Sequence, residues 1–300
     1  MYAVIDVGSN TIRMLTGDCR NRKIEPHKYY REITRLAGNF SEQNGLSDSG
    51  MCKSLAVLKT FNNIISAQNI SQVKVVGTAA LRRAKNQQFF IDKVFVETGL
   101  KIKVITGVEE ALLTTTGALS AVKPTPETAL VVDIGGGSTE LICIIAGKIH
   151  FQTSYPLGVV RLCEEFSSET ARQQQIDLIF KQFSESLAAL GLADRKYQLI
   201  GTAGTITTLA AMDLQLKTYD ALRINNHELS ILCLEKLQQK LKFSSVLERE
   251  MMIGMEQGRG DLILPGLQII LSLMHNFSLS TLKVSDSGLL EGVILGLTDL

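Results

Sequence analysis

The chain has 300 residues, and at about 150 residues per domain this length predicts two domains that need no disulfide bonds to be stable. Hydrophobic residues make up 45% and charged residues 20%, which excludes a disordered chain, and no apolar run reaches the ~18 residues that a membrane span requires. The net charge of +1 is unevenly distributed, with 16 Lys and Arg against 10 Asp and Glu in residues 1–121, and 15 against 20 in residues 122–300. A basic first half favours an anionic ligand, although two solvated surfaces of chance sign would give the same distribution.

Residues 1–121 predict an α/β domain that opens with a β-hairpin. The expected strands are 3–7, 12–17, about 23–36, 73–76 and 102–105. One helix is expected to carry the apolar positions between 51 and 65, a second to span 86–97 and a third to begin near 107. Asp48 and Ser49 are expected to cap the first of these helices.

Residues 122–300 predict a second domain of the same kind. The expected elements are a hairpin at 129–134 and 139–146, a helix at 172–190, a strand at 198–200, a helix at 205–212, helices over much of 228–275, a strand at 282–284 and a helix from about 287. Met251, Met252 and Met255 fit a buried helix face. The segment 123–127, with two of the five prolines, is the predicted linker. The predicted domains are therefore 1–122 and 123–300, with the option that the terminal helix 287–300 packs back on the first.

One pattern occurs twice, 127 residues apart. An apolar strand ends at Asp6, and Gly8-Ser9-Asn10 precedes a second strand; in the later copy a strand ends at Asp133, and Gly135-Gly136-Gly137-Ser138-Thr139 follows. Glycine permits a positive φ and close approach of a ligand, and successive amides in such a turn form an anion-binding nest. Plain hairpin turns are the alternative, but two matched copies, each with an aspartate, predict a phosphate site.

A third glycine loop, Gly201–Thr205, follows a predicted strand and opens a helix, which is another geometry that suits an anion. A fourth, Ser285–Gly288, lies between the last strand and the last helix. The chain contains neither a Walker A loop nor a G-x-G-x-x-G fingerprint.

Taken together, these motifs resemble the exopolyphosphatase and guanosine pentaphosphate phosphatase (Ppx/GppA) family in its short, two-domain form. The resemblance covers nearly the whole chain, and its most specific segments are 6–13, 77–86, 106–111, 133–140 and 201–208. It implies two ribonuclease H-like domains of the actin, hexokinase and Hsp70 ATPase superfold, with an interdomain cleft.

The resemblance implies that Glu110, the second acid of Glu109-Glu110-Ala111, is the catalytic carboxylate that activates water. The local sequence separates the two acids, because Thr106-x-x-Glu109 fits a capping box while Glu110 has no evident structural task. The alternative is that both acids only complement the helix dipole.

The resemblance also implies that Asp133 and Glu140 are metal-side carboxylates, with Asp6 contributing through water, for Mg²⁺ or alternatively Mn²⁺. Asp133 could instead only close its own turn. Arg13 takes the place of Glu140 in the first copy, which suggests that one domain binds phosphate and the other the metal. The predicted phosphate-binding residues are Gly8, Ser9, Asn10, Arg13, Arg82, Gly135, Gly136, Gly137, Ser138, Gly204 and Thr205. Arg83, Lys85 and the basic residues at 20, 22, 23, 28, 31 and 35 could extend this site.

The sequence departs from the family pattern in two places. Leu290 stands where the family often has an arginine, and the usual acidic-Arg-Ala-Asp stretch is Glu256-Gln257-Gly258-Arg259-Gly260-Asp261. The four histidines lie far apart and are expected to be non-catalytic, and the five scattered cysteines predict reduced thiols in a cytoplasmic protein.

The leading functional prediction is a Mg²⁺-dependent hydrolase that removes terminal phosphate from inorganic polyphosphate. Removal of the 5′ phosphate of guanosine pentaphosphate (pppGpp) is the alternative within the family, and an ATP-dependent small-molecule kinase of the same superfold is the second alternative. A non-catalytic sensor of these anions is a further possibility, against which the intact carboxylates argue. No nucleic-acid or membrane partner is expected, and a homodimer is left open.

Overall fold

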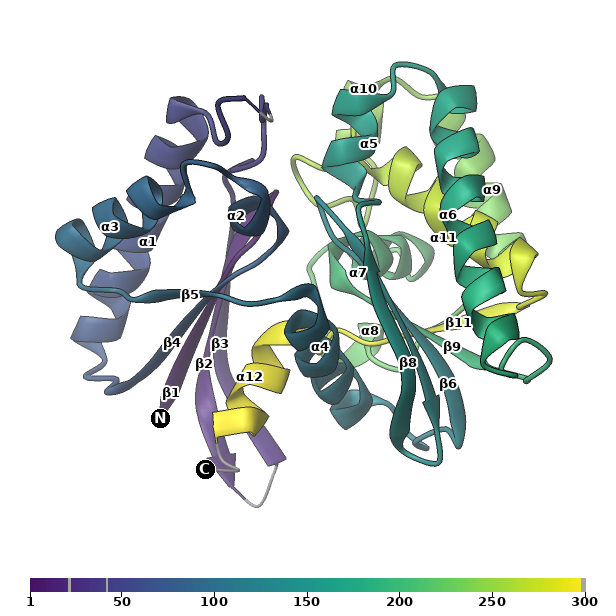
Figure 1. Cartoon of the computed structure of the whole chain (residues 1–300), viewed down its shortest axis with the longest axis horizontal. Coiled ribbons are helices and arrows are strands. Elements are labelled where there is room, and N and C mark those ends of the chain that lie inside the picture. Colours follow the sequence, from purple (N-terminus) through teal and green to yellow (C-terminus); the bar gives the residue numbers. More distant parts are fainter. Residues whose placement is uncertain (21–22, 42, 298–300) are drawn as a thin grey trace. The chain divides into compact units, whose positions relative to one another are not determined.

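The computed structural model describes residues 1–20, 23–41 and 43–297, and the chain divides into two compact units (Figure 1). Unit 1 consists of residues 1–117 together with 288–300, and unit 2 of residues 118–287. The observed division thus lies at 117/118, where the sequence suggested 122/123, and the terminal helix belongs to unit 1.

Unit 1 contains one five-stranded mixed sheet in the order β3-β2-β1-β4-β5. Its elements are β1 (Tyr2–Val7), β2 (Thr11–Arg20), β3 (Lys23–Ile33), α1 (Asp48–Ala67), β4 (Gln72–Gly77), α2 (Ala79–Arg83), α3 (Gln87–Thr98), β5 (Ile102–Val104), α4 (Gly107–Ala121), whose last turn lies in unit 2, and α12 (Leu289–Leu297). The first three strands are antiparallel neighbours, whereas β1, β4 and β5 run parallel. This confirms the predicted opening hairpin.

Both faces of the unit 1 sheet are covered. One face packs with α1 and α3 around a core that includes Leu58, Phe61 and Phe90. The other face carries Val4 and Leu15, which pack against α12, as Figure 1 shows for that helix beside β1 and β2. Residues on the two faces alternate along each strand because side-chain direction in a strand has a period of two.

Helix α1 begins one residue earlier than the expected caps. Its N-cap is Ser47, whose hydroxyl accepts a hydrogen bond from the Gly50 amide, so the assignment of the cap to Asp48 or Ser49 was wrong. Asp48 lies instead in the first turn, where its charge complements the amide dipoles.

Unit 2 contains a six-stranded mixed sheet in the order β10-β11-β9-β6-β7-β8. Its elements are β6 (Thr128–Ile134), β7 (Thr139–Ile145), β8 (Lys148–Tyr155), α5 (Val159–Glu165), α6 (Glu169–Ala189), β9 (Gln198–Thr202), α7 (Ala203–Asp213), α8 (Ala221–Ile224), β10 (Glu228–Ser230), α9 (Ile231–Lys242), α10 (Val246–Glu250), α11 (Ile263–Asn276) and β11 (Thr281–Val284). Helices α6, α9 and α11 lie side by side (Figure 1) and share one large core with the sheet.

The two sheets repeat one another over five strands. The order β3-β2-β1-β4-β5 in unit 1 corresponds to β8-β7-β6-β9-β11 in unit 2, with the same parallel and antiparallel pairings, and β10 is an addition at the edge. This is the ribonuclease H-like arrangement that the family resemblance implied. The twelve-residue pattern therefore marks a repeat of the whole sheet.

The sequence analysis was wrong about the methionines near residue 250. Residues 251–262 are irregular rather than helical, and Met251 is 85% exposed. The prediction failed because three methionines close together satisfy a helical spacing as easily as an irregular turn. Strand β8 and helix α5 were not predicted.

No helix within the described residues has both the length and the apolarity needed to cross a membrane.

Helices α4 and α12 approach closely enough that their backbones touch. A Cβ added at Gly292 would overlap the carbonyl oxygen of Leu113, and one added at Gly117 would overlap that of Gly288. Leu290, the departure from the family pattern, is 2% exposed and packs in the apolar cluster beneath this contact. Close packing of backbone against backbone explains why these positions are glycine.

We predict that Gly292→Ala lowers the free energy of unfolding by about 1–3 kcal/mol, because the helices must separate to admit the methyl group. Gly296→Ala is the matched control on the same helix, since its Cβ would lie 3.7 Å from the nearest atom, a Leu113 methyl. That control should be neutral or gain up to ~1 kcal/mol in helix propensity. Urea denaturation of both variants checks this, and equal effects would contradict the steric explanation.

Candidate active site

The two Asp-x-Gly turns have the same backbone hydrogen bond. The Gly8 amide donates to the Thr11 carbonyl at 3.1 Å, and the Gly135 amide donates to the Ser138 carbonyl at 2.9 Å. Neither glycine has a positive φ, so that part of the sequence prediction was wrong. The glycines are needed for space instead, because a Cβ at Gly8 would lie 2.9 Å from the Thr11 oxygen.

The second turn is also fixed by the helix that follows β8. The amides of Val159 and Val160 donate to the Gly135 and Gly136 carbonyls at 3.0 and 2.9 Å. A Cβ at Gly158 would overlap the Gly136 backbone. These two hydrogen bonds use carbonyl groups of the turn, whereas an anion would bind to its amides.

In unit 1 the residue opposite the aspartate is an arginine. Asp6 on β1 pairs with Arg13 on β2, and Arg13 pairs with Arg31 on β3. The Arg13 guanidinium donates to Asp6 Oδ2 from Nε at 2.9 Å and from Nη2 at 2.5 Å. Because residues directly opposite in antiparallel strands share a face, Asp6, Arg13 and Arg31 form one row of charged side chains.

In unit 2 the same positions hold two acids and a serine. Asp133 on β6 pairs with Glu140 on β7, and Glu140 pairs with Ser154 on β8. The Ser154 hydroxyl donates to Glu140 Oε1 at 2.6 Å. Asp133 is 8% and Glu140 1% exposed, so two carboxylates lie opposite each other in a largely dry environment, where like charges are unfavourable.

This acid pair fits a magnesium ion chemically. Mg²⁺ prefers oxygen ligands and is usually held by one or two carboxylates together with water and substrate oxygens. Among the described residues, no three or more His, Cys, Asp or Glu side chains are grouped so that they could hold a metal ion. The pair alone therefore supplies the oxygen donors, and the third predicted contributor, Asp6, is occupied by its ion pair with Arg13.

The two acids at the start of α4 have different surroundings. Glu109 accepts from the Thr106 amide at 2.8 Å, and the Glu109 amide donates to the Thr106 hydroxyl at 3.1 Å, which confirms the predicted capping box. The Thr106 amide, aided by Lys103, holds the pKa of Glu109 below its ordinary value. Glu110 takes no part in the cap and is 7% exposed.

Glu110 is paired with Arg82, which the sequence analysis did not foresee. Arg82 Nη1 donates to Glu110 Oε2 at 2.5 Å and to the Ile105 carbonyl at 3.0 Å. Arg82 was predicted to bind phosphate, and the structure places it as the residue that holds the carboxylate of Glu110. No sequence signal gives this contact, since the two residues are 28 positions apart. The neighbouring Arg83 lies over the Phe40 ring, 4.7 Å from its centroid.

The third glycine loop leads directly into α7. Ala203, its first helical residue, has φ of +70°, a left-handed conformation that is unfavourable for a residue with a Cβ. Gly204 and Thr205 follow within the first turn, and Thr205 is buried against Gly266 of α11. Strained backbone of this kind concentrates at functional sites.

The side chains of the first turn are buried and not all are satisfied. Ser9 and Asn10 are each 4% exposed. Neither Oδ1 nor Nδ2 of Asn10 has a hydrogen-bond partner within the part of the chain that the structure describes. Buried polar groups without a hydrogen-bond partner are rare in folded proteins. The role of Asn10 in binding stays a prediction.

The histidines and cysteines have structural surroundings. His227 lies 2.7 Å from Asp213, and His275 lies 3.2 Å from Glu235. Burial raises the pKa of Cys143 to about 12, and burial together with Asp213 raises that of Cys233 to about 12. These two thiols are therefore poor nucleophiles.

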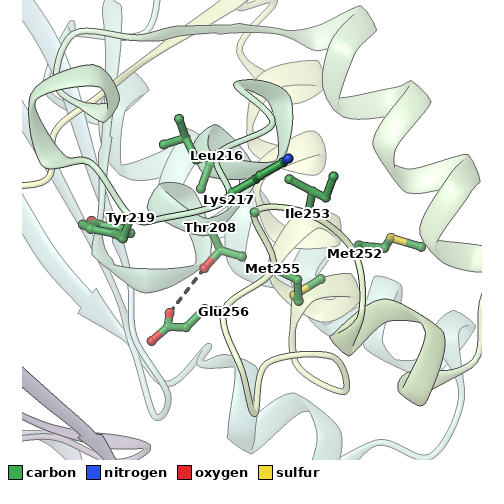
Figure 2. Close-up of a pocket in the computed structure, with 10 residues that line it drawn as sticks. Thr208, Leu216, Lys217, Tyr219, Met252, Ile253, Met255 and Glu256 are labelled. Atoms are coloured by element: carbon green, nitrogen blue, oxygen red, sulfur yellow. Dashed lines mark hydrogen bonds between the residues drawn. The ribbon is translucent and has the colours of Figure 1, made fainter.

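Unit 2 also contains a pocket of about 370 Å³ that the sequence analysis missed (Figure 2). Its walls come from α7, the loop after it and the irregular segment 251–262, and the lining residues are Thr208, Ala211, Leu216, Lys217, Tyr219, Met252, Ile253, Gly254, Met255 and Glu256. The Thr208 hydroxyl lies 3.4 Å from the Glu256 carboxylate, as the dashed line in Figure 2 marks. Glu256 in turn accepts a hydrogen bond from the buried Arg259 at 2.6 Å. In the stretch 256–261, which departs from the family pattern, the arginine is therefore held in an ion pair.

Comparison with known proteins identifies relatives over the whole chain. The sequence profile of the Ppx/GppA phosphatase family matches residues 20–300. Among solved structures, an exopolyphosphatase from Cytophaga hutchinsonii is 28% identical with a TM-score of 0.91, over 99% of this chain and 97% of that one. An Aquifex aeolicus PPX-GPPA enzyme is 30% identical with a TM-score of 0.80, over 98% of each chain.

Two curated relatives are longer proteins. A bifunctional 3-dehydroquinate synthase/phosphatase from Fusobacterium nucleatum is 30% identical over 98% of this chain and 46% of its own length. A guanosine-5′-triphosphate,3′-diphosphate pyrophosphatase from Aliivibrio fischeri is 28% identical over 100% of this chain and 59% of its own length. The chain thus spans about half the length of the curated relatives it matches.

We predict that Ala203→Gly raises the free energy of unfolding by about 1 kcal/mol, because glycine adopts the left-handed conformation without a Cβ penalty. Ala210→Gly, in the interior of the same helix, is the control and should lower it by ~1 kcal/mol or more. Thermal and urea unfolding of both variants measure the difference. Destabilisation by both substitutions would show that Ala203 is not strained.

Proposed function

The chain belongs to the Ppx/GppA phosphatase family, and from this premise we propose that it is a Mg²⁺-dependent phosphohydrolase that releases terminal phosphate from inorganic polyphosphate. The observation that carries the proposal is the contrast at equivalent register positions, where Arg13 stands opposite Asp6 and Glu140 stands opposite Asp133. A cation in one row suits phosphoryl oxygens, and a pair of buried acids in the other suits a divalent metal. Enzymes of this family are phosphatases, and the polyphosphate substrate is the specific part of the proposal.

In this mechanism the residues of unit 1 bind the substrate and activate water. The Gly8–Asn10 turn and Arg13 bind oxygens of the terminal phosphoryl groups, because backbone amides and a planar guanidinium both donate hydrogen bonds to anionic oxygen. Glu110, held by Arg82, accepts a proton from the attacking water. The water oxygen bonds to the terminal phosphorus, the bridging P–O bond breaks, and orthophosphate leaves a chain shortened by one unit.

The residues of unit 2 would hold the metal and a second part of the anion. Asp133 and Glu140 supply carboxylate oxygens to Mg²⁺, and Ser154 keeps Glu140 oriented through its hydrogen bond. When bound, Mg²⁺ would neutralise charge on the phosphoryl oxygens. The Gly135–Ser138 turn and the Gly204–Thr205 helix start would present backbone amides to anionic oxygen.

Polyphosphate is favoured by the charge of the first half and by the solved relatives. Residues 1–121 carry six more basic than acidic residues, which suits a long polyanion better than a compact nucleotide. The exopolyphosphatase from Cytophaga hutchinsonii matches this chain over almost its entire length.

Hydrolysis of pppGpp is the second candidate, and the pocket behind α7 favours it. A volume of about 370 Å³ lies within the range of small-molecule sites, and its mixture of Tyr219, Met255, Lys217 and Glu256 suits a flat, polar base. The Aliivibrio fischeri relative is named for this kind of substrate.

Phosphate release from polyphosphate, pppGpp and ATP, measured in parallel with and without Mg²⁺, tests the proposal. Polyphosphate should give the highest kcat/KM. Preference for pppGpp would establish the second candidate, and formation of ADP only with an added acceptor would indicate a kinase.

We predict that Glu110→Gln lowers kcat by about 10²–10⁴-fold with little change in substrate binding, because a general base typically contributes that much. Glu109→Gln is the matched control, since it alters the neighbouring acid and removes only part of a helix cap. Its cost should be confined to ~1 kcal/mol of stability. An inactive Glu109→Gln beside an active Glu110→Gln would reverse the assignment.

We predict that Glu140→Gln weakens Mg²⁺ binding by about ten-fold or more, because one of two carboxylate ligands is lost. In chelator the same variant should unfold at a higher temperature than the wild type, because the repulsion of Asp133 is relieved. Glu185→Gln, on the exposed side of α6, is the control for loss of one negative charge. A melting temperature that Mg²⁺ raises equally in wild type and Glu140→Gln would exclude the metal site, whatever the activity.

A further inference from the structure

Strand β3 adds a third charged residue to the row at Asp6. Arg31 lies directly opposite Arg13, which lies directly opposite Asp6. Both Arg13 hydrogen bonds of the row go to the single oxygen Oδ2 of Asp6. Two guanidinium groups therefore face the same side of the sheet at adjacent positions, an arrangement in which like charges repel.

The repeat shows what this position does in the other unit. Ser154 is the counterpart of Arg31, and its hydroxyl donates to Glu140 and so orients a carboxylate. Arg31 cannot orient Arg13 in this way, because a guanidinium has donors only and no acceptor. The third position of the row therefore holds a cation in unit 1, where unit 2 holds a hydroxyl that orients a carboxylate.

The end of β3 is also tied to the phosphate turn. The amides of Thr34 and Arg35 both donate to the Asn10 carbonyl, at 3.0 and 2.9 Å, and the Ala37 amide donates to the Ser9 carbonyl at 2.9 Å. Arg35 has φ of +51°, so the chain turns sharply back onto Ser9 and Asn10. The strand that carries Arg31 is therefore fixed to the turn that we assign to the terminal phosphate.

From these observations we propose that Arg31 is a substrate-binding residue that contacts the next phosphoryl group along the chain from the one bound by Arg13 and the Gly8–Asn10 turn. A phosphoryl oxygen between the two guanidinium groups would accept charge-assisted hydrogen bonds from both. Arg31 is half-buried, which strengthens such a contact relative to a fully solvated surface arginine.

This inference rests on the proposed function and makes it more specific. A linear polyanion would leave the turn over β3, which extends the site along unit 1. A substrate with a short run of phosphates would use Arg31 less than a long one. The residue is thus expected to favour long polyphosphate over pppGpp and over tripolyphosphate.

The test compares Arg31→Ala with Lys28→Ala in the 300-residue chain. The sequence analysis allowed Lys28 to extend the site, but the structure places this exposed cation three residues from Arg31 on the same strand, and so on the opposite face, 5.0 Å from the centroid of the Tyr30 ring. Lys28 is therefore outside the proposed site and serves as the control. Arg31→Ala should raise KM for long polyphosphate by about ten-fold, the effect of one charged hydrogen bond, with kcat little changed. Arg31→Lys should recover part of the loss, because it restores the charge without the planar fork.

Binding measured over a range of salt concentrations gives the sharper readout. In the Glu110→Gln background, the slope of log affinity against log salt for long polyphosphate should fall by about 0.7–0.9 in Arg31→Ala, as one counterion-releasing contact is lost. Lys28→Ala should keep the slope of its parent. For tripolyphosphate the effect of Arg31→Ala should be smaller.

The outcomes separate the two proposals. If the wild type releases phosphate from polyphosphate while Arg31→Ala, folded by circular dichroism, keeps the wild-type KM and salt slope, the role of Arg31 is wrong and the proposed function stands. If the wild type neither binds nor hydrolyses polyphosphate, the proposed function itself fails. Equal losses in Arg31→Ala and Lys28→Ala would indicate general surface charge and would also overturn the inference.

Discussion

In each of the two hairpins, backbone hydrogen bonds fix which residue lies directly across from the aspartate at the end of the first strand. The tight turn sets this register, and a shift of one residue would send every following side chain to the other face. The turn in unit 1 therefore brings Arg13 to Asp6, and the turn in unit 2 brings Glu140 to Asp133. Each pair lies beside the glycine turn of its own unit.

The same register has opposite electrostatic consequences in the two units. In unit 1 the pair is a buried ion pair, in which the carboxylate is compensated by Arg13. In unit 2 the pair consists of two acids, and burying them is costly unless a cation or a proton is shared between them. The same arrangement of the backbone thus holds a compensated carboxylate in one sheet and, in the other, the pair of acids that we propose for a divalent cation.

Close approach of backbones supports both sites. Glycine at Gly158 lets the start of α5 contact the Gly136 backbone, and glycine at Gly292 lets α12 contact α4, the helix whose first turn carries Glu110. Packing without side chains leaves little freedom for movement at these contacts. The carboxylate of Glu110 is further restrained by Arg82, which joins the start of α4 to the end of α2. The site in each unit is therefore built on rigid elements rather than on long loops.

The sequence by itself determined the hairpins, the repeat, the family resemblance and the division of labour between Glu109 and Glu110. These depend on local patterns: alternation of apolar residues, turn glycines, and the three-residue spacing of a capping box, which the structure confirms. The spacing of seven residues between Asp133 and Glu140 is also one that a hairpin can bring to one face, and the observed register places the two acids opposite each other.

Only the tertiary structure decided the contacts between residues distant in the chain. The Arg82–Glu110 ion pair and the position of Arg31 beside Arg13 depend on how separate elements pack, and no spacing encodes them. The irregular segment at 251–262 and its pocket escaped prediction for the same reason, since Met252 and Met255 line a pocket together with residues of α7 rather than continuing a helix. The sequence indicated that the turns at positions 8 and 135 require glycine. The folded turns show that the reason is steric space and not a positive φ. This space is limited by atoms that only the folded turn brings together.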